Sequence, residues 1–152
     1  MNTQRQLERV EQLLSPWAAA ATHPQPNRVD LEISAGDLLA AVNSLVDAAW
    51  GYLVAISGVD PGVETGALWV LYHFAEDAAV ATLRVVVSRI DPVVSTIRHI
   101  VALAGIYEQE LTEILGIRID GADDNGRLFL PDDWPDGVFP LRKDFEPASI
   151  GI

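Results

Sequence analysis

The chain has no cysteine and few cationic side chains. Without thiols it cannot form a disulfide, use a thiolate nucleophile or hold an iron–sulfur cluster through cysteine. Ten Lys and Arg residues stand against 22 Asp and Glu residues, which gives a formal net charge of −12. Because a surface this acidic repels the phosphates of nucleic acids and the headgroups of anionic lipids, we expect no nucleic-acid partner.

The sequence also lacks an apolar stretch long enough to cross a membrane. Its most apolar run, residues 79–87, is interrupted by Arg84, whereas a membrane-spanning helix needs about 20 apolar residues. The first residues are polar and acidic, unlike those of a signal peptide. We therefore expect a cytoplasmic protein without direct membrane insertion, which would reach a membrane only through a partner.

Hydrophobic residues make up 49 % of the 152 residues, enough for one domain with its own core. Helical spacing of apolar residues predicts a first helix over residues 3–21, ended by the prolines at 24 and 26. Ser34 is the predicted N-cap of a second helix that reaches residue 49. Helical spacing resumes after Pro92 as far as Ala104, and a short helix over residues 106–115 ends at Gly116.

Strands are predicted over residues 28–33, 51–59, 67–75 and 79–88, where apolar residues alternate or run together. The strand at 67–75 is apolar on both faces, which is typical of a strand inside a sheet that is covered on both sides. A layer of helices would cover one face, and another element or a partner protein the other. The predicted fold is α+β: a four-stranded mixed sheet with helices mainly on one face.

The sequence changes character near residue 120. Residues 1–119 form the predicted α+β domain, and residues 120–152 are rich in Gly, Pro and Asp, with separate apolar islands. We expect this second part to be an extended C-terminal segment held by a few anchor residues.

Candidate chemical groups are sparse. The three histidines, His23, His73 and His99, lack the spacing of metal ligands, and His73 is interpreted as a hydrogen-bonded packing residue. The acidic run that starts at Asp120 does not fit a calcium loop, because Ala122 occupies a ligand position. We expect neither a metal nor another cofactor.

Three carboxylates, Glu108, Glu110 and Glu113, crowd the helix over residues 106–115. They would suit acid–base catalysis if burial separated their pKa values. The alternative is a solvated acidic face, since no histidine, lysine or candidate nucleophile lies nearby in the sequence.

The C-terminal segment contains a cationic pair, Arg142 and Lys143, flanked by Leu141 and Phe145. Two apolar residues that bracket two cations can form a docking peptide for a partner. The alternative is a tail that packs on its own domain. The sequence leaves both interpretations open.

These segments resemble a known family. The helix Ile106–Ile117, the stretch Arg127–Trp134 and the sequence Phe139-Pro140-Leu141-Arg142-Lys143-Asp144-Phe145 are similar to motifs of the C subunit of NADH:quinone oxidoreductase (respiratory complex I). The related subunit of membrane-bound [NiFe]-hydrogenases has them as well. The resemblance covers most of residues 28–147.

The resemblance implies a cofactor-free structural and assembly subunit in the peripheral, cytoplasmic arm of such a complex. Its partners would be the hydrogenase-like large subunit and a neighbouring iron–sulfur subunit, and the isolated chain would have no activity. The expected partner-binding residues are Leu141, Arg142, Lys143, Asp144, Phe145 and Trp134. Glu108, Glu110 and Glu113 would then form a structural acidic motif. The alternatives are a stand-alone acidic adaptor and, less favoured, a carboxylate-based hydrolase.

Overall fold

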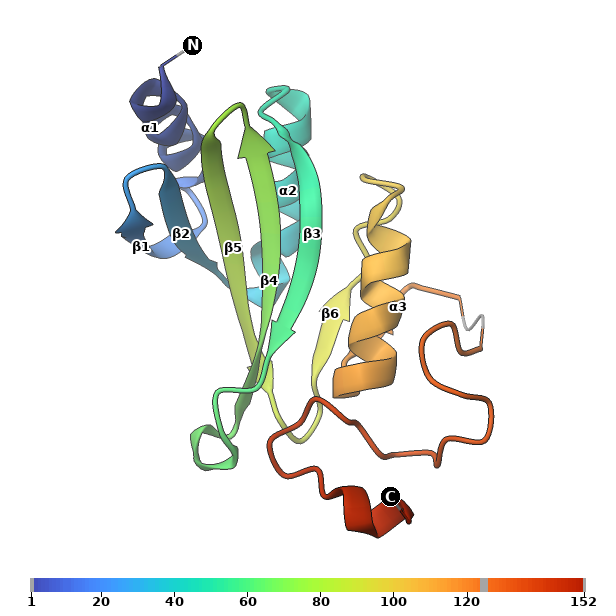
Figure 1. Ribbon diagram of the computed structural model, residues 1–152. Helices are drawn as coiled ribbons and strands as arrows, with labels where there is room; N and C mark the ends of the chain where they lie inside the picture. The colour runs from blue at the N-terminus through green and yellow to red at the C-terminus, as the bar shows by residue number, and fades with distance from the viewer. Residues whose placement is uncertain (1, 124–125, 152) are drawn as a thin grey trace.

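A computed structural model describes residues 2–123 and 126–151 and shows a five-stranded sheet with helices packed against it (Figure 1). In chain order the elements are α1 (Thr3–Leu14), β1 (Ala18–Gln25), β2 (Arg28–Ile33), the 3₁₀ turn η1 (Ala35–Asp37), α2 (Leu38–Asp47), β3 (Tyr52–Val59), η2 (Val63–Thr65), β4 (Ala67–Glu76), β5 (Ala79–Ser88), β6 (Val93–Ser95), α3 (Ala104–Leu115), β7 (Arg118–Asp120) and η3 (Pro147–Ile150).

The sheet is mixed, as predicted, and the α+β fold is confirmed. Its strand order is β1-β2-β5-β4-β3, with β2 and β5 parallel and the other neighbours antiparallel. The buried side chains of β2, β4 and β5 form one core with those of α1, α2 and α3. Two short strands, β6 and β7, pair in parallel as a separate ribbon.

The fifth strand corrects the predicted first helix. α1 ends at Leu14, and the alanine-rich run that follows joins the sheet as β1, with Ala18 opposite Ile33. Pairing with β2 has therefore overridden the helix propensity of the alanines. Pro24 is compatible with β1 because this strand lies at the edge of the sheet, where a missing N–H donor costs little.

The predicted helix between Pro92 and Ala104 is also wrong. Residues 93–95 form β6, turns follow, and α3 begins at Ala104 and continues through Gly105 without a break. The backbone after β6 is bonded to a carboxylate of α3, because the N–H of Ile97 donates to Glu108 at 3.0 Å. The apolar spacing that resembled a helix comes from a strand and turns that bury Val94 and Ile97.

β4 lies inside the sheet, between β5 and β3. The face that carries Trp69, Leu71 and His73 is only half-buried, so the described residues do not provide a complete second cover. His73 is the predicted hydrogen-bonded packing residue: its ring nitrogens lie 3.0 Å from Ser57 Oγ and 2.9 Å from Thr82 Oγ1.

Among the described residues, no helix has the length and apolar character to cross a membrane.

Candidate functional site

The tail, whose described residues are 121–123 and 126–151, runs from α3 to the end of the sheet where β3 and β5 finish (Figure 1). β3 and β5 both run antiparallel to β4, so their C-terminal ends lie at the same end of the sheet. Asp60 follows β3 directly and Arg89 follows β5 directly. The topology thus brings together two opposite charges that are 29 residues apart in the chain.

Asp60 and Arg89 form a buried, two-pronged ion pair. Arg89 Nη1 lies 2.5 Å from Asp60 Oδ1 and Nη2 lies 2.7 Å from Oδ2, and the Arg89 and Asp60 side chains are 9 % and 2 % exposed, respectively. Hydrogen bonding to Arg89 holds the pKa of Asp60 well below its usual value, and the N–H groups of Lys143 and Gly62 add to this effect. The pair is therefore ionised throughout the physiological pH range.

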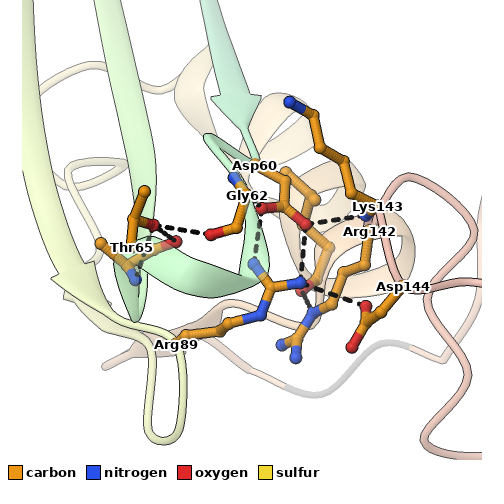
Figure 2. Close-up of polar contacts among 9 residues, drawn as sticks. Asp60, Gly62, Thr65, Arg89, Arg142, Lys143 and Asp144 are labelled. Atoms are coloured by element: carbon orange, nitrogen blue, oxygen red, sulfur yellow. Dashed lines mark hydrogen bonds and ion pairs between the residues drawn. The ribbon is translucent and has the colours of Figure 1, made fainter.

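The tail binds to this pair through its backbone and one carboxylate (Figure 2). The N–H of Lys143 donates to Asp60 Oδ2 at 2.7 Å, and Arg89 Nη2 donates to Asp144 Oδ1 at 3.1 Å. We call Asp60, Arg89, Lys143 and Asp144 the tail clamp. It joins the ends of β3 and β5 to the sequence motif that the resemblance singled out.

The same stretch of tail also covers the C-terminal end of α3. The N–H of Leu141 donates to the carbonyl of Ile114 at 3.2 Å, and Arg142 Nε donates to the carbonyl of Leu115 at 2.8 Å. The guanidinium of Arg142 also lies 4.8 Å from the centre of the Phe139 ring. Carbonyl groups at the end of a helix have no partner within the helix, so a cation and an N–H from the tail stabilise this end.

The predicted partner-binding residues thus divide into two sets. Arg142, Asp144 and Phe145 contact their own chain, and the Phe145 ring lies 6.1 Å from that of Trp134. Leu141 is 58 % exposed and the Lys143 side chain is also exposed. Lys143 takes part in none of the ion pairs among the described residues. That these residues bind a partner stays a prediction.

Glu108 of α3 is 2 % exposed. Its carboxylate accepts hydrogen bonds from Thr96 Oγ1 at 2.6 Å and from the N–H of Ile97 at 3.0 Å. Burial raises the pKa of Glu108 above its usual value, although these two donors oppose the effect. Glu108 therefore connects α3 to the segment that follows β6.

Glu113 of α3 connects the helix to the tail. Its carboxylate accepts from three consecutive backbone N–H groups, those of Leu128, Phe129 and Leu130, at 3.0 to 3.1 Å. Burial would raise the pKa of Glu113, but these donors outweigh it and the pKa lies below its usual value. Gln109 supports the same loop by donating to Glu113 and to the carbonyl of Gly126.

Glu110, the third glutamate, is half-buried. The carboxylates of Glu108 and Glu113 are engaged by different segments of the chain, residues 96–97 and residues 128–130 respectively, which disfavours the hydrolase alternative. Within residues 2–123 and 126–151 there is no group of three or more His, Asp or Glu side chains that could hold a metal ion.

Sequence reasoning found the tail motif and the acids of α3 but missed Asp60 and Arg89. The available signal was weak: an Asp-Pro-Gly turn after one strand and an arginine after another. Neither implies an ion pair unless the strand order is known.

The fold is shared with a chain of a solved respiratory assembly, the membrane-bound sulfane sulfur reductase, described as an archaeal respiratory membrane complex. The two chains superpose with a TM-score of 0.80 at 20 % sequence identity, over 96 % of this chain and 88 % of the other. At that identity the likeness establishes the fold alone.

The sequence establishes the family. A family model described as "Respiratory-chain NADH dehydrogenase, 30 Kd subunit" matches residues 31–150, which include most of the sheet, α3 and the tail. The chain belongs to this family, and the resemblance seen in its motifs is confirmed.

Two relatives show the range of the family. The C subunit of the NADH-quinone oxidoreductase of Chloroherpeton thalassium is 38 % identical over 102 residues, which cover 65 % of this chain and 41 % of the relative. Membrane-bound hydrogenase subunit beta of Pyrococcus furiosus is 43 % identical over 54 residues, 36 % of this chain and 31 % of the relative. The matched part thus spans less than half the length of either relative.

Proposed function

We propose that this chain is a cofactor-free structural and assembly subunit in the peripheral arm of a membrane-bound oxidoreductase. The parent complex would be a complex I-like NADH:quinone oxidoreductase or a membrane-bound [NiFe]-hydrogenase. The single observation that carries the proposal is the family match, which runs through the sheet and the tail to residue 150. The names of the two relatives support both kinds of parent complex.

In this proposal the chain packs on the hydrogenase-like large subunit, beside an iron–sulfur subunit, and lies at the inner face of the cell membrane through that complex. The outward side of the clamped tail is the docking surface. Leu141 supplies an exposed apolar side chain, and Lys143, the only lysine of the chain, supplies an exposed cation. Because the tail clamp fixes the backbone between them, docking would not have to order this segment first, which lowers the cost of association.

A tagged chain isolated from native membranes with a mild detergent tests the proposal. We expect mass spectrometry to find the hydrogenase-like large subunit in stoichiometric amount. Purification of the chain alone, or with proteins unrelated to such a complex, would contradict the proposal.

Outward-facing variants test the docking surface. Truncation of interface anchors typically costs about 2 kcal/mol or more, so Leu141→Ala with Lys143→Ala should weaken association at least tenfold and leave the melting temperature of the free chain unchanged. A matched control replaces another exposed leucine and cation, Leu39 and Arg5, with alanine.

A second pair of substitutions, Arg142→Ala with Phe145→Ala, should also weaken association. These side chains contact their own chain, so their loss would act by changing the position of the tail.

A further inference from the structure

A cavity of about 580 Å³ lies between α3, the β7 segment and the tail. Ile106, Ile117, Leu128 and Phe139 give it apolar walls, and Arg98 and Arg118 also line it. Its volume falls in the range of about 300–1,000 Å³ that is typical of sites that hold a ligand. None of the contacts of the tail clamp uses this space.

Gly105, in the first turn of α3, also lines the cavity. Its φ is not in the left-handed region, so its backbone does not require glycine. A Cβ placed on residue 105 would have Arg98 Cδ, at 3.9 Å, as its nearest described neighbour, leaving aside the adjacent residues and the backbone of α3 itself. Glycine destabilises a helix relative to alanine, yet no packing within the described chain requires it here.

Two other glycines show the contrast. At Gly58 a Cβ would lie 2.1 Å from Leu115 Cδ1, and at Gly116 it would lie within 2.7 Å of the Phe139 ring. There the chain's own side chains fill the space beside the glycine. At Gly105 the corresponding space belongs to the cavity.

The rim of the cavity indicates the kind of occupant. Ile106 and Leu128 line the cavity and are nevertheless 52 % and 63 % exposed. A small molecule inside the cavity would leave the outer parts of both side chains in water, whereas a protein segment would cover them as well. Burial of these apolar surfaces favours a protein segment.

The charged residues at the rim indicate that the occupant also carries a carboxylate. Arg98 is paired with Asp123 at 2.7 Å and Arg118 with Asp91 at 3.4 Å, and the two aspartate side chains are 77 % and 75 % exposed. Exposed pairs of this kind contribute little to stability, so a carboxylate from another protein can replace one of them. Arg118, itself 60 % exposed, is the better placed of the two arginines to receive it.

We infer that the cavity beside Gly105 receives a bulky apolar side chain from a segment of the hydrogenase-like large subunit, with an acidic residue of that segment facing Arg118. This inference rests on the proposed function and adds to it a second contact, separate from the outward side of the tail. The partner segment would approach the backbone of α3 closely, which accounts for a glycine where the fold does not need one.

The absence of cysteine allows a direct test. Gly105→Cys introduces the only thiol of the chain, and Gly36→Cys is the matched control, since a Cβ at Gly36 meets nothing within 4 Å and its φ is also ordinary. The rate of N-ethylmaleimide labelling is measured for each variant in the free chain and in the complex purified with the large subunit. We expect the thiol at position 105 to be slowed at least tenfold more by assembly than the thiol at position 36.

Equal slowing at the two positions would overturn the inference. A thiol at position 105 that is already protected in the free chain, with a small molecule detected by native mass spectrometry, would also overturn it in favour of a small ligand. In both cases the proposed function stands as long as the wild-type chain co-purifies with the large subunit. If the wild-type chain does not co-purify, the proposed function fails and the inference fails with it.

A filling variant provides an independent measurement. Gly105→Leu should occupy the cavity, leave the melting temperature of the free chain unchanged or higher, and weaken assembly at least tenfold. Gly36→Leu should leave assembly unchanged. Normal assembly of Gly105→Leu would overturn the inference. If Gly105→Leu melts at a lower temperature than the wild type, the thiol-labelling comparison decides.

Discussion

The body of the protein, up to Ile117, and the tail are held in place by different forces. Every fully buried apolar side chain among the described residues lies between Leu7 and Ile117. The tail is held instead by polar contacts, both to the charged groups of Asp60, Arg89 and Glu113 and to backbone carbonyls at the end of α3. The body is therefore stabilised mainly by apolar burial, whereas the position of the tail depends on a small number of polar contacts.

The largest effect is expected for Arg89→Ala, because Arg89 lies in the body and also donates to Asp144 of the tail. The change leaves the Asp60 carboxylate buried without its cation, and removing one partner of a buried pair costs about 3–5 kcal/mol. We expect a loss of that size in the free energy of unfolding, measured by urea denaturation. Arg118→Ala is the control: its pair with Asp91 is exposed, so the loss should be within about 1 kcal/mol. Similar losses in the two variants would mean that the buried pair of Asp60 and Arg89 does not stabilise the fold.

Glu113→Gln should affect the tail more than the body. Hydrogen bonds to a charged group contribute about 1.5–3 kcal/mol, and the neutral amide is a weaker acceptor for the N–H groups of residues 128–130. We expect faster hydrogen–deuterium exchange at these three amides, with little change in the amides of β4 and β5.

Glu110→Gln is the matched control for this change, since Glu110 lies on the same helix and is only half-buried. It should leave exchange at residues 128–130 unchanged. Faster exchange throughout the sheet of Glu113→Gln would show that the tail and the body unfold as one unit, contrary to the comparison.

The smallest expected effect is a pH dependence in the body. Burial raises the pKa of Glu108 in the folded chain above the ordinary value of 4.5. Above pH 4.5 the unfolded chain therefore loses this proton first, and the contribution of Glu108 to stability falls as the pH rises through the folded pKa. Glu108→Gln removes this titration, so its stability relative to the wild type should improve as the pH rises above 4.5 in urea unfolding experiments. A difference that stays constant with pH would contradict the burial argument.

The carboxylates that hold the tail behave in the opposite way. The pKa values of Asp60 and Glu113 are lowered in the fold. Their contribution is complete above the ordinary values of 3.8 and 4.5 and is lost as the pH falls toward the folded values. Acid should therefore release the tail, while Glu108 gains its proton.

Within the body the sequence predicts some strands well and others poorly, and the reasons are physical. β2 and β5 carry a clear two-residue alternation, and β4 an apolar run, because sheet packing sets those patterns directly. The alanines of β1 have no such pattern, since this strand is mostly exposed and is specified by its pairing with β2. Residues 93–104 carry helical spacing, but they form β6 and turns, and the N–H of Ile97 donates to Glu108.

The candidate site was only partly predictable. The segment Leu141–Phe145 was identifiable from its composition and its resemblance to a family motif. Asp60 and Arg89 determine which side chains of this segment face the body. These two residues meet only because β3 and β5 finish at the same end of the sheet. The anchoring of the tail loop by Glu113 could not be predicted either, because its partners are backbone N–H groups, which nearly every residue type provides.

If another subunit covers the outward side of the clamped tail, assembly must protect the single lysine of the chain, Lys143. Reductive methylation of the Lys143 amine is followed by mass spectrometry in the free chain and in the complex purified from native membranes, with Lys143→Arg as the control that identifies the modified site. We expect assembly to slow modification of Lys143 at least tenfold. Equal rates in the free and assembled states would contradict it.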